Sequence, residues 1–190
     1  MTYFLRVIGA TALTLCMSMA ASAQIVVGGT GAAHSCYQAA KFGNQGNLKT
    51  IKECKSALSE FDLSLKDTAA THVNIGVLYM RRDDNKNAQY HYQKAIELRP
   101  KMAEIYINYG ASLIHIGDYN GAVTAINKAI DLETVKMPEA LYNRAIAYDR
   151  LENYKGAYKD LKQALVLKPE WPAALKVLEN YTVTRAPKSN

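Results

Sequence analysis

The sequence is poor in the residues that bind metals. It has 3 cysteines and 4 histidines among 190 residues, and they show neither the Cys-x-x-Cys nor the His-x-x-x-His spacing of zinc sites. This scarcity excludes a recognisable zinc motif, so no metal is expected. We expect the histidines on the surface or in a groove: His34, His72, His91 and His115.

Catalytic motifs are also lacking. The glycine-rich stretch at 28–31 is not followed by the Gly-Lys-Ser/Thr of a phosphate loop, and no helical pattern starts there. Gly110-Ala111-Ser112 lacks the second glycine of a nucleophile elbow, and Ser112 lies within a helical pattern. No nucleophile with an acid or base is visible, so the sequence predicts a protein that is not an enzyme and needs no cofactor.

Neither sign of charge dominates strongly. Lys and Arg number 23 against 17 Asp and Glu, which gives a formal net charge of +6, and basic residues are scattered among acidic ones. This distribution is typical of a solvated helical surface and predicts no nucleic-acid partner. Acidic polypeptides and anionic membrane surfaces remain open as partners.

Long apolar runs are confined to the N-terminus, and the run there is too short for a membrane span. After Arg6 it extends from Val7 to Leu15, and small residues follow up to Ala21-Ser22-Ala23. This order is that of a secretory signal peptide, here residues 1–23, with cleavage after Ala23. The remaining chain is expected to have no integral membrane span and to reach the periplasm.

Cys16 leaves processing as a lipoprotein open as an alternative. Such signals favour a small residue before the cysteine, and Leu15 stands there, so we favour the site after Ala23. Cleavage at that site removes one basic residue, Arg6, and no acidic residue, which gives the mature chain a net charge of +5.

Two cysteines, Cys36 and Cys54, remain in a chain bound for an oxidising compartment. They are expected to form a disulfide bond, which in the chain-entropy model would stabilise the fold by about 3 kcal/mol. A metal site built from both thiols and His34 is the alternative, although the spacing of zinc sites is missing.

An internal repeat is the informative feature of the sequence. Each copy has asparagine two residues before a small residue, then large residues and alanines at fixed intervals. The copies read Asn74, Gly76, Tyr79, Ala88, Tyr92, Ala95, Leu98; Asn108, Gly110, Leu113, Ala122, Ile126, Ala129, Leu132; and Asn143, Ala145, Tyr148, Ala157, Leu161, Ala164, Leu167. The period is 34 residues and then 35, so one residue has been inserted, most simply within 133–137.

These intervals fit helical periodicity, and the small residues allow two antiparallel helices to approach closely. The spacing resembles the tetratricopeptide repeat, a helix-turn-helix unit of 34 residues. The resemblance implies an all-α fold, a right-handed α-solenoid of such units that binds other proteins. The expected divisions are a signal peptide 1–23, a flexible leader 24–34, a degenerate N-terminal helical hairpin 35–68, repeat units 69–102, 103–137 and 138–171, a C-terminal capping helix 172–184 and a disordered tail 185–190.

Repeats of this family bind partners in a concave groove lined by the first helix of each unit. Asn74, Asn108 and Asn143 recur on that helix, and their amides can donate to and accept from the backbone of an extended peptide. The alternative is that these asparagines support packing between units. The other residues expected to bind the partner are Val73, Val77, Arg81, Ile107, Ala111, His115, Tyr142, Ile146 and Arg150.

This lining suits a peptide with apolar side chains and some negative charge. The family's carboxylate clamp for chaperone C-termini needs lysines where Val73, Ile107 and Tyr142 stand, so we reject that ligand. The sequence predicts a periplasmic adaptor or scaffold that holds a segment of an unidentified protein. A self-associating structural protein of the cell envelope, a homo-oligomer, is the alternative.

Overall fold

The computed structural model describes residues 3–7, 31–43, 47–60 and 62–185. Most of the expected signal peptide and leader therefore lies outside the described residues, as do residues 186–190 of the expected tail, whereas its first residue, Arg185, belongs to a strand. Among the described helices, none combines the length and the hydropathy that crossing a bilayer requires.

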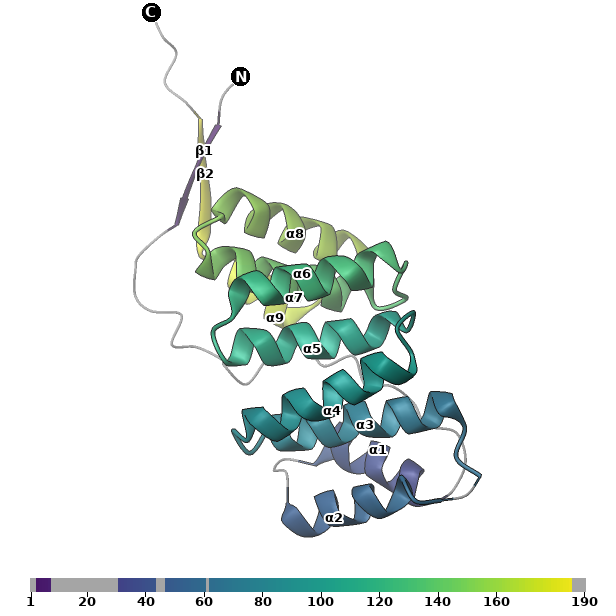
Figure 1. Cartoon of the computed structure of the whole chain (residues 1–190). Coiled ribbons are helices and arrows are strands. Elements are labelled where there is room, and N and C mark those ends of the chain that lie inside the picture. The colour runs from purple at the N-terminus through teal and green to yellow at the C-terminus, as the bar shows by residue number, and fades with distance from the viewer. Residues whose placement is uncertain (1–2, 8–30, 44–46, 61, 186–190) are drawn as a thin grey trace, which may run out of the picture.

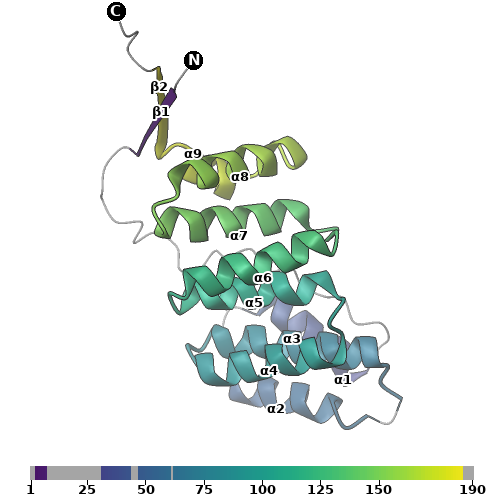
Figure 2. The same ribbon diagram turned by 45° about the horizontal axis from the view of Figure 1, so that its top comes forward.

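Helical hairpins stack in a single row along the molecule (Figure 1, Figure 2). The hairpins are α1 (Ala32–Phe42) with α2 (Leu48–Ala57), α3 (Leu65–Met80) with α4 (Asn85–Leu98), α5 (Ala103–His115) with α6 (Tyr119–Asp131), and α7 (Met137–Arg150) with α8 (Tyr154–Leu167), followed by α9 (Pro172–Leu178). The first helices also pack on one another, α1 on α3, α3 on α5 and α5 on α7. The predicted all-α solenoid is confirmed.

Each repeat turns between its two helices in the same way. The second helix begins at a side-chain cap whose oxygen accepts a hydrogen bond from the backbone N–H three residues on: Asp84 from Asn87, Asp118 from Gly121, and Asn153 from Gly156. The residue before each cap has a left-handed backbone, with φ of 58° at Asp83, 83° at Gly117 and 59° at Glu152. Because caps satisfy N–H groups that the first turn leaves unpaired, they fix where the second helix starts.

Small residues bring the two helices of a repeat together, as the sequence predicts. A Cβ atom added to Gly76 would lie 2.8 Å from Cε1 of Tyr92, and one added to Gly110 would lie 2.6 Å from Cγ1 of Ile126. Both distances are too short for non-bonded carbon atoms, so the glycines are needed for this approach. The repeated alanines of the second helices are fully buried at the same interface: Ala88, Ala95, Ala122, Ala129, Ala157 and Ala164.

The two ends of the array differ from the sequence prediction. Helix α1 begins at Ala32, inside the expected flexible leader, where Glu60 accepts a hydrogen bond from the Ala32 N–H at 3.1 Å. Helix α9 ends at Leu178, six residues before the expected end of the capping helix at 184. The chain continues as a strand, β2 (Tyr181–Arg185), which carries three consecutive β-branched residues at 182–184 that favour extended structure.

Strand β2 pairs with a strand of the expected signal peptide, β1 (Tyr3–Val7). The pairing is antiparallel, with Tyr3 opposite Arg185 and Val7 opposite Tyr181. The N-terminal strand thus lies at the C-terminal end of the array, beside α8 (Figure 1). This pairing is available only to a chain that keeps residues 3–7.

Candidate partner-binding surface

The N-terminal hairpin is held by the predicted disulfide bond. Cys36 on α1 and Cys54 on α2 are bonded to each other and are buried. Because both sulfur atoms are used in this bond, the alternative metal site with His34 is wrong for this structure. Instead, Nε2 of the His34 ring lies 3.1 Å from Nε2 of Gln38.

Arg81, which was expected in the binding groove, closes the end of α1. Its Nη1 donates to the carbonyl oxygen of Gly43 at 2.6 Å and lies 3.5 Å from that of Ala39. Ala39 lies in the last turn of α1, where its carbonyl already accepts from the Gly43 N–H at 2.9 Å, and Gly43 is the residue that follows the helix. Arg81 thus supplies a side-chain donor to the carbonyl that ends the helix. Burial lowers the pKa of the Arg81 guanidinium, which still keeps its charge. Arg81 therefore connects the N-terminal hairpin to the first repeat.

The three repeated asparagines are buried. Asn74, Asn108 and Asn143 are each at most 1% exposed. Nδ2 of Asn108 donates to the Glu104 carbonyl one turn earlier in α5 at 2.9 Å. Neither amide atom of Asn74 has a hydrogen-bond partner among the residues that the structure describes. Such burial is what the packing alternative expects, and an amide ladder would act on a peptide only if these groups became uncovered.

Most of the other predicted groove residues are buried as well, namely Val73, Val77, Ile107, Ala111 and Tyr142. Tyr142 lies against Trp171, with ring centroids 4.8 Å apart, where the chain turns into α9. The remaining three predicted residues reach the surface near the C-terminal ends of α5 and α7: His115 and Ile146 are partly buried and Arg150 is exposed. Nε2 of His115 lies 2.8 Å from a carboxylate oxygen of Asp83.

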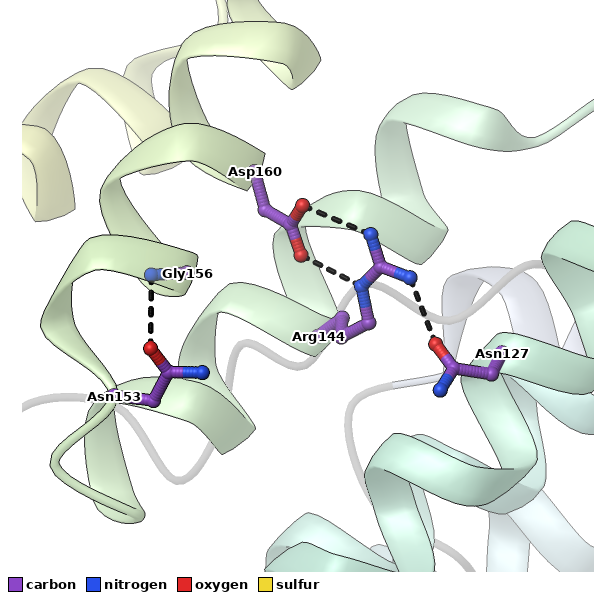
Figure 3. Close-up of polar contacts among 5 residues, drawn as sticks. All are labelled: Asn127, Arg144, Asn153, Gly156 and Asp160. Atoms are coloured by element: carbon purple, nitrogen blue, oxygen red, sulfur yellow. Dashed lines mark hydrogen bonds and ion pairs between the residues drawn. The ribbon is translucent and has the colours of Figure 1, made fainter.

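The structure also reveals a buried polar network that the sequence reasoning missed (Figure 3). Arg144 of α7 donates to both carboxylate oxygens of Asp160 on α8, at 2.7 and 2.9 Å, and to Oδ1 of Asn127 on α6 at 2.7 Å. The ion pair raises the pKa of Arg144 further. A charged residue at a position that is Ile75 or Tyr109 in the other repeats was the available signal. This network holds three helices together and offers no open site, since Asp160 is 2% exposed.

Two of the histidines face each other instead of the solvent. Nδ1 of His72 on α3 lies 2.9 Å from Nδ1 of His91 on α4, and the His91 ring stacks on Tyr79. Burial lowers the pKa of His91 to about 4, and the positive charges of His72 and Lys55 contribute. Burial also lowers the pKa of His72. The surface or groove location predicted for His91 is wrong, because its side chain is buried between the two helices.

Comparison with known protein families identifies the repeats. Sequence profiles described as the tetratricopeptide repeat match residues 69–102, 103–134 and 138–171. These are the hairpins α3–α4, α5–α6 and α7–α8. The unmatched residues between the second and third repeats, 135–137, lie within the expected site of the insertion, 133–137.

Two relatives contain similar segments. The Protein SGT1 homolog of Oryza sativa subsp. japonica is 39% identical over 75 residues, which is 40% of this chain and 20% of that protein. The Lipoprotein NlpI homolog of Haemophilus influenzae is 32% identical over 101 residues, which is 53% of this chain and 32% of that protein. The chain spans no more than about a third of the length of these relatives.

A solved structure, MamA AMB-1, shares the fold. It matches with a TM-score of 0.54 at 17% identity and covers 77% of this chain and 76% of its own. Proteins built from such repeats are in general non-catalytic modules that bind other proteins. Because the repeat profiles match more than half of the sequence and fall on three stacked helical hairpins, the chain belongs to the tetratricopeptide-repeat family.

Proposed function

We propose that this protein is exported and binds a segment of a protein partner without catalysing a reaction. The observation that carries the proposal is the continuous stack of three tetratricopeptide repeats, because stacked repeats present an extended surface that no single repeat has. The Cys36–Cys54 disulfide supports export, since such bonds persist in oxidising compartments. The name of the Haemophilus influenzae relative, a lipoprotein homolog, supports a place in the cell envelope.

The proposed contact surface lies where the first helices of the second and third repeats end. His115, Ile146 and Arg150 reach the surface there, on α5 and α7. Ile146 offers an apolar contact, and Arg150 offers a guanidinium that can bind a carboxylate through two hydrogen bonds. A peptide with an apolar side chain next to an acidic one fits this surface. Two of the buried asparagines, Asn108 and Asn143, belong to the same two helices.

Site-specific photo-crosslinking in the native host tests this proposal. A photoreactive residue at Ile146 is expected to give a product with a second protein, whereas one at Lys86, on the exposed side of α4, is not. Arg150→Ala is expected to reduce the Ile146 product several-fold. Arg99→Ala, which removes an exposed arginine from the α4–α5 loop, is the matched control and should leave the product unchanged.

Two results would overturn the proposal. If Ile146 crosslinks only to a second copy of this protein, the protein is the self-associating alternative. If the products from Ile146 and Lys86 are the same and neither responds to Arg150→Ala, the proposed surface does not bind a partner.

A further inference from the structure

The exposed side of α8 differs from that of the two helices at equivalent places in the other repeats. Four positions, one helical turn apart, point to solvent or to its edge on each second helix. They are Lys86, Tyr90, Gln93 and Glu97 on α4; Asn120, Thr124, Asn127 and Asp131 on α6; and Lys155, Lys159, Lys162 and Val166 on α8. The first two sets are mixed and each ends in an acid. The third set, which we name the α8 lysine face, has three cations and no acid.

The lysines of this face form no ion pair with any described carboxylate. All three are exposed. The one acid in α8, Asp160, is buried and held by Arg144. On α4, by contrast, Lys94 pairs with Glu97 at 2.7 Å. A concentration of unpaired positive charge therefore lies on the last full helix of the array.

An exposed apolar side chain completes the face. Val166 is 77% exposed and stands where α4 and α6 have Glu97 and Asp131. Its neighbour Leu167 is 52% exposed, whereas the leucines at the equivalent positions, Leu98 and Leu132, are partly buried. At protein interfaces apolar contacts form the buried centre, and complementary charges around it select the partner.

We propose that the α8 lysine face binds an acidic segment of a partner protein, with carboxylates along Lys155, Lys159 and Lys162 and an apolar side chain over Val166. This inference rests on the proposed function as a protein-binding module and assigns it a second surface, separate from His115, Ile146 and Arg150. Lysines at intervals of four and three residues match acids at the same intervals on a helical partner.

A protein partner fits this face better than a membrane does. Helices that lie in a bilayer surface bury their apolar side in the lipid, but the apolar side of α8, including Ala157, Leu161 and Ala164, is already buried in the repeat. Only the three lysines would then face the headgroups, and so few charges give weak and reversible attraction. A peptide can in addition cover Val166 and Leu167.

Peptide binding to the purified protein tests the inference. The probe is a fluorescent helical peptide with glutamates at i, i+4 and i+7 and leucine at i+11, measured by anisotropy at two salt concentrations. The triple variant Lys155→Glu, Lys159→Glu and Lys162→Glu is expected to bind at least tenfold more weakly. The control Lys49→Glu, Lys52→Glu and Lys86→Glu makes the same change in net charge at exposed sites on α2 and α4 and should bind within about twofold of wild type.

Val166→Ser separates the apolar contact from the charges. It is expected to weaken binding of the leucine peptide several-fold. Binding of a peptide with serine at i+11 should not change. Equal losses in the two triple variants, or no binding of the peptide, would overturn the inference. So would binding to vesicles containing phosphatidylglycerol that is lost in the α8 variant while the peptide does not bind. If the α8 inference fails but Ile146 still crosslinks to a partner, the proposed function stands.

Discussion

Arg144 and Asp160 form a buried ion pair, and removing one partner should destabilise the protein more than removing both. Asp160→Ala would leave the Arg144 guanidinium without its carboxylate in a site where that carboxylate is 2% exposed. We expect the free energy of unfolding in urea to fall by about 3–5 kcal/mol. The double variant Arg144→Leu with Asp160→Leu replaces both charges by apolar side chains and should lie within about 1 kcal/mol of wild type.

The exposed pair Lys94–Glu97 provides the control. Its atoms approach as closely, at 2.7 Å, but both side chains are solvated. Glu97→Ala should change the free energy of unfolding by less than about 1 kcal/mol. If Asp160→Ala has an effect as small as that of Glu97→Ala, the buried network does not hold α6, α7 and α8 together.

Asn74 is a buried amide without a hydrogen bond to any described residue, so its removal should stabilise the fold. Asn74→Leu keeps a similar volume and is expected to raise the free energy of unfolding by about 1 kcal/mol, because an unpaired buried amide carries its full desolvation cost. Asn108→Leu is the comparison. Asn108 donates a hydrogen bond to the Glu104 carbonyl, so this change should not raise the free energy of unfolding. A stabilised Asn74→Leu protein that has lost its Ile146 crosslink would support the amide ladder. Loss of stability would show that Asn74 makes a contact the packing needs.

The His72–His91 contact predicts a stability that falls in acid. One ring must donate and the other accept, so the contact cannot hold two imidazolium ions. The pKa of His91 is about 4 in the fold, below the ordinary 6.5, so the unfolded chain binds more protons between these values. Stability present above pH 6.5 is therefore lost as the pH falls toward 4.

Urea unfolding at pH 7 and pH 4.5 measures this loss, which we expect to be on the order of 2 kcal/mol for this pair. His91→Leu should show a smaller loss. Identical pH profiles for wild type and His91→Leu would contradict the assignment.

At the scale of elements, the Cys36–Cys54 disulfide should stabilise the N-terminal hairpin and little else. The helices it joins have only 11 and 10 residues, too few to be stable alone in water. The double variant Cys36→Ser with Cys54→Ser is expected to lose about 3 kcal/mol, the loop-closure contribution. Hydrogen exchange should show lost protection in α1 and α2 and retained protection in α7 and α8, since repeats contact only their neighbours.

Arg81→Ala is the matched change for the same hairpin, because it removes the side chain that caps α1 and leaves the disulfide in place. It should reduce the protection of α1 from hydrogen exchange less than the cysteine variant does. Loss of protection spread evenly over all four hairpins would instead mean that the array unfolds as one unit.

At the scale of the whole molecule, export predicts that the N-terminus is processed. The intact mass of protein isolated from the native host should correspond to a chain beginning at Gln24, without β1 and its pairing to β2. An N-terminal Cys16 with added lipid would identify the protein as a lipoprotein. A mature chain that still contains residues 3–7 would contradict export by a cleaved signal and would leave β1 as a part of the fold.

The repeat pattern made most of the helices predictable. Spacings of 34 and 35 residues, with glycine or alanine opposite Tyr92, Ile126 and Leu161, are local consequences of two helices in contact, so they can be read from one chain. The ends of the array were less predictable. Helix α1 needs Glu60 from elsewhere in the chain, and β2 pairs with residues far away in sequence.

The candidate site was predicted less well than the fold. The first helix of each repeat was correctly identified, but which of its side chains are covered depends on the neighbouring helices, and a pattern in one repeat does not contain that information. Tyr142 is buried because Trp171 lies on it. Arg81 is not available to a partner because it donates a hydrogen bond to the end of α1. The lysines of α8 were visible in the sequence but became significant only once Asp160 was seen to face inward.

The sequence by itself determined the repeat, the helical hairpins and the pair of cysteines available for a disulfide, because periodicity and residue size act over short distances along the chain. Only the tertiary structure decided which side chains are buried, which charges are paired and which remain exposed. Those properties depend on desolvation and on contacts between helices that are distant in sequence. Asn74 and Lys159 illustrate the difference, since both are polar residues on helices, yet packing buries the first and leaves the second in solvent.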